Sequence, residues 1–306
     1  MRVAVTGSHG LVGEALVRFL SAAGLQTTRV VRSDPGSGEV GWDPTGGVIQ
    51  ADGLRGIGAV VHLAGEPIAA RRWTEAHKRR VRDSRVLGTR LIAQALAGLH
   101  DGPQVLVCSS GMNYYGDRGD EILTEDSGPG EGFLAQVCQE WEAAADPARA
   151  AGVRVVHLRT ALVLSPTGGL LEKVLPLFKL GLGGRLGSGR QYWSWVSVDD
   201  VVGIIGHALS SDALAGPVNT VAPAPVTNEE FTSTLAGVLG RPALAPVPRF
   251  GPRILLGQMA DELLFSSTRL LPARLQAHGY EFRHPKLEPA LRDLLGRPAD
   301  GRTLAS

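Results

Sequence analysis

The sequence predicts an α/β fold, a doubly wound parallel sheet with a smaller C-terminal lobe. Three observations support this prediction. Short, wholly apolar runs recur through the first half of the chain, separated by longer segments with helical periodicity. Such runs are typical of parallel strands covered by helices on both faces. The 306 residues also include 40 glycines, which suit many tight strand–helix turns, and few aromatic residues.

The expected elements of the first half alternate along the chain. The strands are Arg2–Thr6, Thr27–Val31, Ala59–Leu63, Gln104–Cys108 and Val153–Leu158, and the helices are Leu11–Ala23, Thr74–Leu99 and Phe133–Ala151. Because crossovers between parallel strands are right-handed, these helices should cover both faces of one sheet.

The second half is less regular because prolines interrupt it. We expect helices at Gly168–Leu182, Asn228–Leu239 and Pro252–Leu264, and strands at Trp193–Val198 and Gly216–Val221. Asp199 or Asp200 should cap the helix that follows the first of these strands, with a catalytic carboxylate as the alternative. We assign residues 1–165 and 192–222 to the sheet domain, 166–191 and 223–296 to a substrate lobe, and 297–306 to a flexible tail.

Composition excludes several classes of function. A net charge of +1 gives no reason to expect a nucleic-acid partner. The two cysteines, Cys108 and Cys138, cannot form a disulfide framework or a zinc site, and the scattered histidines show no metal-ligand spacing. No apolar stretch approaches the ~20 residues that span a bilayer. The N-terminus shows no signal peptide, so we expect a cytoplasmic protein without a membrane partner.

The strongest motif is TGSHGLVG, Thr6–Gly13, which follows the first strand and opens the first helix. Its glycines are spaced G-x-x-G-x-x-G. Gly7 permits the turn out of the strand, Gly10 lets backbone approach a pyrophosphate, and Gly13 lets the helix pack on the sheet. The helix N-terminus then offers free amides to phosphates. We therefore predict a Rossmann-type dinucleotide site contacted by Gly7, Ser8, His9, Gly10, Leu11, Val12 and Gly13; a glycine-rich turn without a ligand is the alternative.

The end of the second strand indicates which dinucleotide is bound. Sites for NAD usually carry an acid there to hold the ribose 2′-hydroxyl. This chain has Arg32 and Ser33 instead, and a guanidinium suits a 2′-phosphate. We therefore predict NADP(H), although an ordinary surface arginine would look the same in the sequence.

Several motifs together resemble one family. They are TGSHGLVG, HLAGEPI (His62–Ile68), RRW (Arg71–Trp73), DSR (Asp83–Arg85), YYG (Tyr114–Gly116), LRTALVLSPTGG (Leu158–Gly169) and LGLGGRLGSGRQYWSW (Leu180–Trp195). The chain resembles, over about residues 1–295, the atypical short-chain dehydrogenases/reductases called "epimerase family protein", which are related to NAD-dependent epimerases/dehydratases. The resemblance implies a Rossmann domain that binds NADP(H). It also implies cofactor contacts at Leu63, Ala64, Gly65, Arg85, Arg159 and Thr160, and it leaves a homodimer open.

The catalytic pair of the wider superfamily, Tyr-x-x-x-Lys on a helix, is missing. Its Tyr must exchange a proton despite an ordinary pKa near ~10, and its Lys lowers that pKa and grips the ribose. If Glu142 marks the usual helix acid, Leu134 and Cys138 occupy the two positions. We predict that Ser110 and Tyr115 face the nicotinamide instead, where Ser110 would polarise a carbonyl and Tyr115 would donate a proton. The alternative is that both only shape the pocket.

Three functions remain open at this point. The first is an NADP(H)-dependent oxidoreductase or epimerase-like enzyme acting on an unknown small polar molecule. The second is a non-catalytic NADP(H)-binding sensor or scaffold, which the missing pair favours. The third is an NAD-dependent nucleotide-sugar epimerase, against which Arg32 argues.

Overall fold

The computed structural model describes residues 1–32, 34–243 and 246–297, and the chain forms two compact units. Unit 1 comprises residues 1–114, 132–159 and 202–218, and unit 2 comprises residues 115–131, 160–201 and 219 onward. Of the expected site residues, Ser33 lies outside the described residues, as does most of the expected tail, from residue 298.

Unit 1 is built on an eight-stranded sheet whose strand order is β12-β8-β6-β5-β1-β2-β3-β4. The strands are β1 (Arg2–Thr6), β2 (Gln26–Val31), β3 (Val40–Asp43), β4 (Val48–Ile49), β5 (Ala59–His62), β6 (Val105–Gly111), β8 (Arg154–Thr160) and β12 (Gly216–Thr220). Strand β1 pairs in parallel with β2 and β5, β2 with β3, and β5 with β6, whereas β4 is antiparallel to β3. This is the Rossmann order, and it confirms the predicted fold class.

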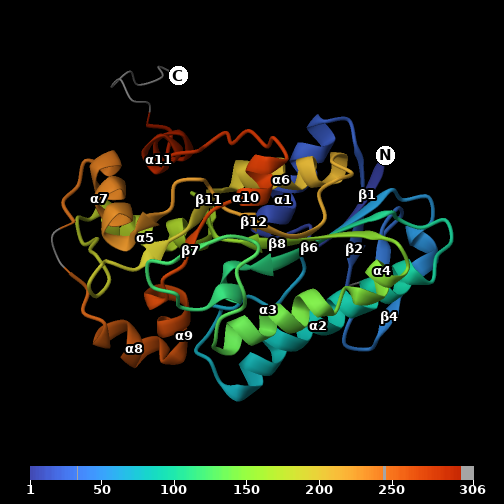
Figure 1. Ribbon diagram of the computed structural model, residues 1–306, viewed down its shortest axis with the longest axis horizontal. Coiled ribbons are helices and arrows are strands. Elements are labelled where there is room, and N and C mark those ends of the chain that lie inside the picture. The colour runs from blue at the N-terminus through green and yellow to red at the C-terminus, as the bar shows by residue number, and fades with distance from the viewer. Residues whose placement is uncertain (33, 244–245, 298–306) are drawn as a thin grey trace. The chain divides into compact units, whose positions relative to one another are not determined.

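Helices cover both faces of the sheet, which explains why consecutive residues of its central strands β1, β5 and β6 are buried (Figure 1). Helix α2 (Glu75–Ala97) lies beside α3 (Phe133–Ala143) and α4 (Asp146–Ala150) on one face. From this face Ile92 packs into a core with Val60 and Leu106. On the other face Phe19 of α1 (Leu11–Ala22) lies against Gly206 of α6 (Val198–Ser210).

Some expected elements were wrong in extent. The single helix expected over Phe133–Ala151 is two helices, and the second begins at Asp146 with Pro147 in its first turn. The helix expected over Pro252–Leu264 is broken at Gly257, whose φ of +61° is not helical. It consists of α8 (Phe250–Leu256), α9 (Gln258–Ala260) and a π-helical turn at Asp261–Phe265. Strands β3 and β4 were not among the expected elements.

Unit 2 surrounds an aromatic core. Trp193 and Trp195 lie in β10 and β11, and both are buried with Phe231 of α7. The elements are β7 (Ile122–Leu123), β9 (Leu162–Ser165), α5 (Gly169–Lys179), β10 (Tyr192–Trp193), β11 (Trp195–Ser197), β13 (Val226–Thr227), α7 (Asn228–Leu239), β14 (Arg269–Leu270), α10 (Ala273–Ala277) and α11 (Leu287–Leu294). Four two-residue strands here form two short pairs, β10 with β13 and β14 with β7.

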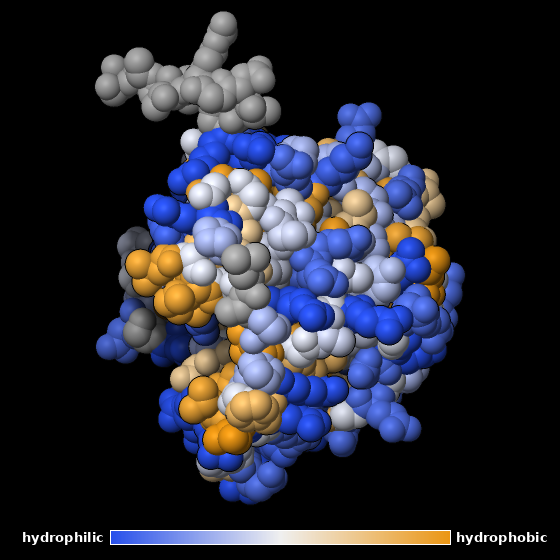
Figure 2. All heavy atoms as spheres, turned by 90° about the vertical axis from the view of Figure 1, so that its left-hand side faces the viewer, coloured by the Kyte–Doolittle hydropathy of each residue, from blue (hydrophilic) through white to orange (hydrophobic). Residues whose placement is uncertain are grey.

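Unit 2 also exposes apolar side chains, and Figure 2 shows them gathered in patches on the face that carries α5, α7 and α8. The most exposed are Leu180, Leu182, Phe250, Ile254 and Leu255. Among the described residues, no helix is both long enough and apolar enough to cross a membrane.

Candidate functional site

The carboxyl ends of β1 and β5 form the point at which strand order reverses, and there Thr6 pairs with His62. Ligands of such sheets bind outside this point. The Thr6 hydroxyl oxygen accepts hydrogen bonds from the amides of Leu63 (3.1 Å) and Ala64 (3.2 Å), so the segment after β5 is held beside the loop after β1. His62 Nδ1 lies 2.7 Å from the same hydroxyl, and burial lowers the pKa of His62 to about 4. His62 is therefore a neutral, packed histidine at the strand end.

The three glycines of the phosphate loop are required for different reasons. Gly7 has a φ of +66°, and a Cβ there would lie 2.9 Å from the backbone nitrogen of Ala64. A Cβ on Gly13 would lie 2.1 Å from the carbonyl oxygen of Gly7. Both positions therefore need glycine for the fold alone. A Cβ on Gly10 would meet only the Gly7 oxygen, at 3.4 Å, so the protein itself leaves room for a side chain there.

A cavity of about 540 Å³ opens at this edge of unit 1, within the usual size range for small-molecule sites. Of the predicted contacts, its wall contains Gly7, Ser8, His9, Gly10, Arg32, Leu63, Ala64 and Gly65. Leu11, Val12 and Gly13 follow in the first turns of α1 and do not line it, and neither do Arg85, Arg159 and Thr160. The wall also contains residues that sequence reasoning missed, namely Val30, Val31, Trp42, Pro44, Glu66, Pro67 and Ser84.

Trp42 and Pro44 were missed because they belong to β3 and the loop after it. The sequence does contain a pattern that predicts β3. The Rossmann order needs a third strand beside the second, and Val40–Asp43 is the apolar run that follows the second strand in the chain.

The polar groups of the cavity fit a phosphorylated nucleotide. The Ser8 hydroxyl is buried and has no hydrogen-bond partner among the described residues, which is an uncommon state for a polar atom. At the mouth, the Arg29 guanidinium donates to His9 Nε2 at 2.6 Å, and Arg32 is exposed to solvent. Buried donors beside surface cations are what phosphate oxygens require.

Ser110, at the end of β6, is already engaged. Its hydroxyl donates to Glu142 at 2.7 Å, and Arg159 binds both oxygens of the same carboxylate at 2.9 Å each. The Arg159 guanidinium also stacks on the ring of Tyr114, 3.4 Å from its centre. In this arrangement Ser110 presents lone pairs and not a proton, and Arg159 is held by Glu142.

Tyr115 belongs to unit 2 and is completely buried. Its hydroxyl donates to Asn219 Oδ1 at 2.7 Å, and the Asn219 amide group donates in turn to the Leu271 carbonyl at 2.9 Å. To donate a proton to a substrate, as predicted, Tyr115 would have to exchange this partner. Thr160 is the last residue of β8 and is partly exposed.

Comparison with known proteins shows where the chain belongs. Residues 3–221 match the model of the NAD dependent epimerase/dehydratase family, and residues 247–294 match a domain of unknown function. The chain is a member of this epimerase/dehydratase family. Epimerase family protein Mb2239 of Mycobacterium bovis is 43% identical over 297 residues, which cover 97% of this chain and 98% of that protein. Human epimerase family protein SDR39U1 is 37% identical over 300 residues, which cover 96% of this chain and all of that one.

A solved structure agrees with the sequence comparison. The crystal structure of human SDR39U1 (isoform2) with NADPH superposes with a TM-score of 0.88 at 36% identity, covering 97% of this chain and 100% of that chain. The resemblance seen in the motifs is therefore confirmed.

The two family positions expected to hold the catalytic Tyr and Lys lie in α3 of unit 1. Leu134 and Cys138 are both buried there. Burial raises the pKa of the Cys138 thiol to about 12, so the thiol stays neutral near pH 7. Leu134 has no proton to transfer, and the neutral Cys138 thiol carries no positive charge.

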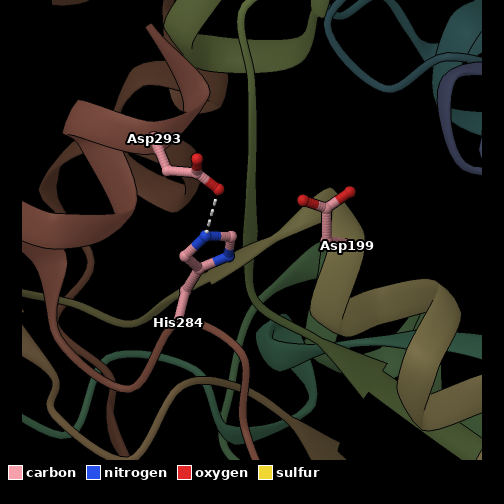
Figure 3. A group of neighbouring side chains, drawn as sticks. All are labelled: Asp199, His284 and Asp293. Carbon is pink, nitrogen blue, oxygen red and sulfur yellow. Dashed lines mark hydrogen bonds and ion pairs between the residues drawn. The ribbon is translucent and has the colours of Figure 1, made fainter. Parts of the chain in front are cut away.

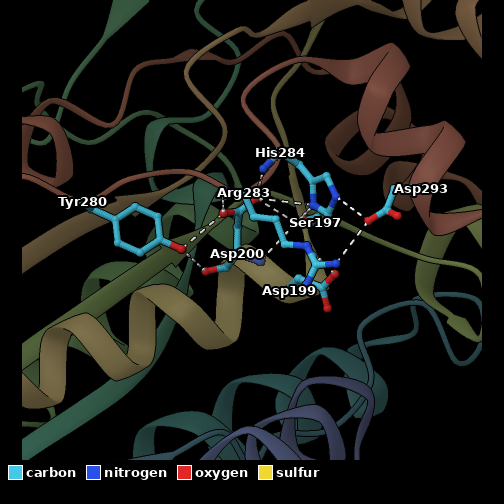
Figure 4. Close-up of polar contacts among 7 residues, drawn as sticks. All are labelled: Ser197, Asp199, Asp200, Tyr280, Arg283, His284 and Asp293. Carbon is cyan, nitrogen blue, oxygen red and sulfur yellow. Dashed lines mark hydrogen bonds and ion pairs between the residues drawn. The ribbon is translucent and has the colours of Figure 1, made fainter. Parts of the chain in front are cut away.

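Outside the cavity, this family member has a polar cluster in unit 2 at the start of α6 (Figure 4). The fully buried Asp200 carboxylate accepts hydrogen bonds from the hydroxyls of Ser197 (2.8 Å) and Tyr280 (3.2 Å) and from the amides of Arg283 (2.8 Å) and His284 (3.0 Å). The Asp200 amide donates to the Ser197 hydroxyl oxygen, and α6 begins at Val198. The predicted cap was therefore wrong: Ser197 caps this helix.

Asp199, His284 and Asp293 bring three possible metal-ligand atoms within 4.8 Å of one another (Figure 3). His284 Nδ1 lies 2.9 Å from the Ser197 hydroxyl, and His284 Nε2 lies 2.9 Å from Asp293. Arg283 lies 3.4 Å from Asp293 and 3.8 Å from Asp199. Because Arg283 and His284 already contact these carboxylates, we interpret the group as an ion-pair cluster.

Proposed function

We propose that this chain binds NADP(H) in the cavity of unit 1 and is an epimerase-like oxidoreductase acting on a small polar substrate. The observation that carries the proposal is the cavity itself: a phosphate loop at the β1–β5 switch point, with an unpartnered buried hydroxyl at Ser8 and a solvent-exposed guanidinium at Arg32. The family membership and the NADPH named for the human relative support it.

In this proposal the residues have separate roles. The amides from Gly7 to Gly13, with the Ser8 hydroxyl, hold the pyrophosphate. Arg32, with Ser33, selects the 2′-phosphate, and Leu63–Gly65 lie along the adenosine. Arg159 and Thr160 are proposed to lie on the nicotinamide side of the cofactor. Arg159 acts there by holding Glu142 and Tyr114 in position. A bound NADP(H) supplies the hydride chemistry.

Proton transfer is proposed for Tyr115, Ser110 or a water molecule. For Ser110 this requires the hydroxyl to turn from the Glu142 carboxylate toward the substrate, where it donates a hydrogen bond to the reacting carbonyl oxygen.

The test is cofactor binding measured by calorimetry at fixed salt. Replacing Arg32 with Ala removes one charge-assisted contact, so we expect NADPH affinity to fall by about 10- to 100-fold and NADH affinity to stay unchanged. Arg18→Ala is the matched control, because Arg18 is an exposed arginine on α1 outside the cavity. If folded wild-type protein binds neither NADPH nor NADH, the proposal is wrong.

A second function, a non-catalytic NADP(H)-binding sensor or scaffold, is favoured by one observation: Leu134 and Cys138 are neutral and buried where the family needs its catalytic pair. Following NADPH absorbance with a panel of carbonyl compounds separates the two functions. The enzyme function is supported if the wild type turns over any compound and the Arg32→Ala variant does not at low NADPH concentration. The sensor function is supported if the wild type binds NADPH tightly and turns over no compound.

We also propose a reducing, cytoplasmic environment, since Cys108 and Cys138 are both free thiols. A homodimer is the proposed oligomeric state by analogy with the family alone, and light scattering tests it directly.

A further inference from the structure

Two segments of unit 2 carry the most exposed large apolar side chains of that unit (Figure 2). Leu180 and Leu182 follow α5 and are 73% and 62% exposed. Phe250, Ile254 and Leu255 belong to α8 and are between 67% and 72% exposed, and no residue of α8 is buried. Side chains in the walls of a groove shield one another from water, so exposed fractions this large mean that these five side chains project from the protein.

The two segments lie side by side. The Gly187 amide donates to the Val247 carbonyl at 2.9 Å, and the Val247 amide donates to the Arg185 carbonyl at 2.8 Å. Nearer to α5, a Cβ on Gly181 would lie 3.5 Å from Cγ of Pro242. The segments therefore form one region, which we call the α5–α8 surface and which comprises residues 169–190, 241–243 and 246–257.

The α5–α8 surface is strongly basic, although the whole chain is nearly neutral. It contains one carboxylate, Glu172, and seven cations, so its net charge is +6, against +1 for all 306 residues. The rest of the chain is therefore negative overall. The seven cations are Lys173, Lys179, Arg185, Arg190, Arg241, Arg249 and Arg253.

Neighbouring carboxylates neutralise only part of this charge. Asp261 pairs with Arg253 at 2.7 Å and with Arg249 at 3.4 Å, and Glu229 lies 3.9 Å from Arg185. The other four cations are exposed and have no ion pair among the described residues; they are Lys173, Lys179, Arg190 and Arg241. Unpaired cations and projecting apolar side chains thus occur together on the α5–α8 surface.

This combination of charge and shape decides between partners. A second copy of the chain would bring like charges together in a symmetric contact, which is unfavourable. A helix of another protein binds in an apolar groove, and projecting side chains do not form one. An anionic bilayer offers negative headgroups to the cations and hydrocarbon to the apolar side chains, and its fluid surface needs no groove.

We propose that the α5–α8 surface binds the surface of an anionic lipid bilayer. Phe250, Ile254 and Leu255 insert at the boundary between headgroups and acyl chains, and the unpaired cations contact the headgroups. The expectation of no membrane partner rested on the absence of a long apolar stretch. Binding to the surface needs no such stretch, because the fold brings together side chains from two separate segments.

The experiment measures co-sedimentation of the full chain with lipid vesicles. One set of vesicles is pure phosphatidylcholine, and the other contains about 30% phosphatidylserine, which gives it a negative surface. We expect the wild type to bind the phosphatidylserine vesicles more strongly, by about ten-fold or more, and to be released from them as the salt concentration rises.

One pair of double variants tests the apolar side chains. Phe250→Ser with Ile254→Ser should bind the phosphatidylserine vesicles about ten-fold or more weakly than the wild type, because two inserted side chains are lost. The matched control is Val48→Ser with Ile122→Ser, since these residues are 62% and 52% exposed and lie outside the α5–α8 surface. The control should bind like the wild type.

A second pair tests the charge. Lys179→Gln with Arg241→Gln should weaken binding to the phosphatidylserine vesicles by about ten-fold or more, since each cation near such a surface strengthens binding by roughly five-fold. The matched control is Arg79→Gln with Arg80→Gln, which removes two exposed arginines of α2. This control should retain most of the binding.

Circular dichroism checks the fold of every variant. If the serine variant does not fold, the glutamine pair and its control decide. Equal binding of the wild type to both kinds of vesicle overturns the inference, and so does a control that loses as much binding as its test variant. Binding to neither kind of vesicle also overturns it, and would leave an acidic protein as the partner. None of these outcomes depends on the proposed cofactor site, which lies in unit 1.

Discussion

Asp200→Asn should destabilise unit 2 strongly, although the two side chains have nearly the same shape. Asp200 is fully buried, and its two oxygens accept four hydrogen bonds, from Ser197, Tyr280, Arg283 and His284. Oδ1 receives the Tyr280 hydroxyl and the Arg283 amide, and Oδ2 receives the Ser197 hydroxyl and the His284 amide. Asn turns one of these acceptors into a donor, so a buried backbone amide, that of Arg283 or that of His284, loses its partner whichever way the side-chain amide is oriented. The Tyr280 hydroxyl keeps the backbone carbonyl oxygen of Asp200 as an acceptor, at 3.2 Å.

The magnitude follows from that count. A buried donor without a partner costs about 1–3 kcal/mol, and the loss of the negative charge also weakens the two bonds that remain. We therefore expect the free energy of unfolding to fall by about 3–5 kcal/mol, the range found when one partner of a buried charged network is removed.

The assay is urea unfolding followed by tryptophan fluorescence, since Trp193 and Trp195 lie in the core of unit 2. Asp199→Asn is the matched control: Asp199 is the neighbouring acid, it is partly exposed, and its ion pair with Arg283 spans 3.8 Å. Such a pair contributes about 0–1 kcal/mol. If the two variants unfold within 1 kcal/mol of each other, the buried carboxylate is not the organising group of this segment.

Three further predictions concern other parts of the molecule. Gly10→Ala should keep the wild-type fold, measured by circular dichroism, and should bind NADPH more weakly. Gly13→Ala should instead lower the melting temperature, because its Cβ would lie 2.1 Å from a backbone oxygen. Equal effects of the two variants on the melting temperature would contradict this prediction. The hydrogen bond from His284 lowers the pKa of Asp293 below its ordinary 3.8. The ionised Asp293 carboxylate therefore stabilises the folded state fully above pH 3.8, and this contribution is lost as the pH falls through the lowered pKa of Asp293. The stability difference between wild type and Asp293→Asn should therefore shrink in acid; a difference independent of pH would refute it. Cys108 and Cys138 are buried and burial raises both thiol pKa values, so a thiol reagent should label them only after unfolding, and rapid labelling of native protein would be the contrary result.

Sequence patterns predicted the sheet and the phosphate loop because both are coded locally. A strand, a turn and a helix that follow one another need only neighbouring residues, and Gly7 and Gly13 are required by contacts with the loop itself and with the next strand end. The apolar strands were recognisable because both faces of the sheet are buried.

Other features could not be predicted because they join distant segments. Trp42 enters the cavity wall only when β3 pairs with β2. The hydroxyl of Ser110 is directed to Glu142, 32 residues away, and no local pattern indicates that the residue predicted to polarise a carbonyl is already engaged.

By itself, the sequence determined that this chain has a Rossmann sheet, a glycine loop for phosphates and no Tyr-x-x-x-Lys pair, because each of these depends on residue type and short spacing. Only the tertiary structure decided that Arg85 is buried with its guanidinium over the Trp141 ring, and that Asp200 organises residues 280–284. The physical reason is that the cost of a buried charge depends on which distant groups fold around it, and spacing along the chain does not record those neighbours.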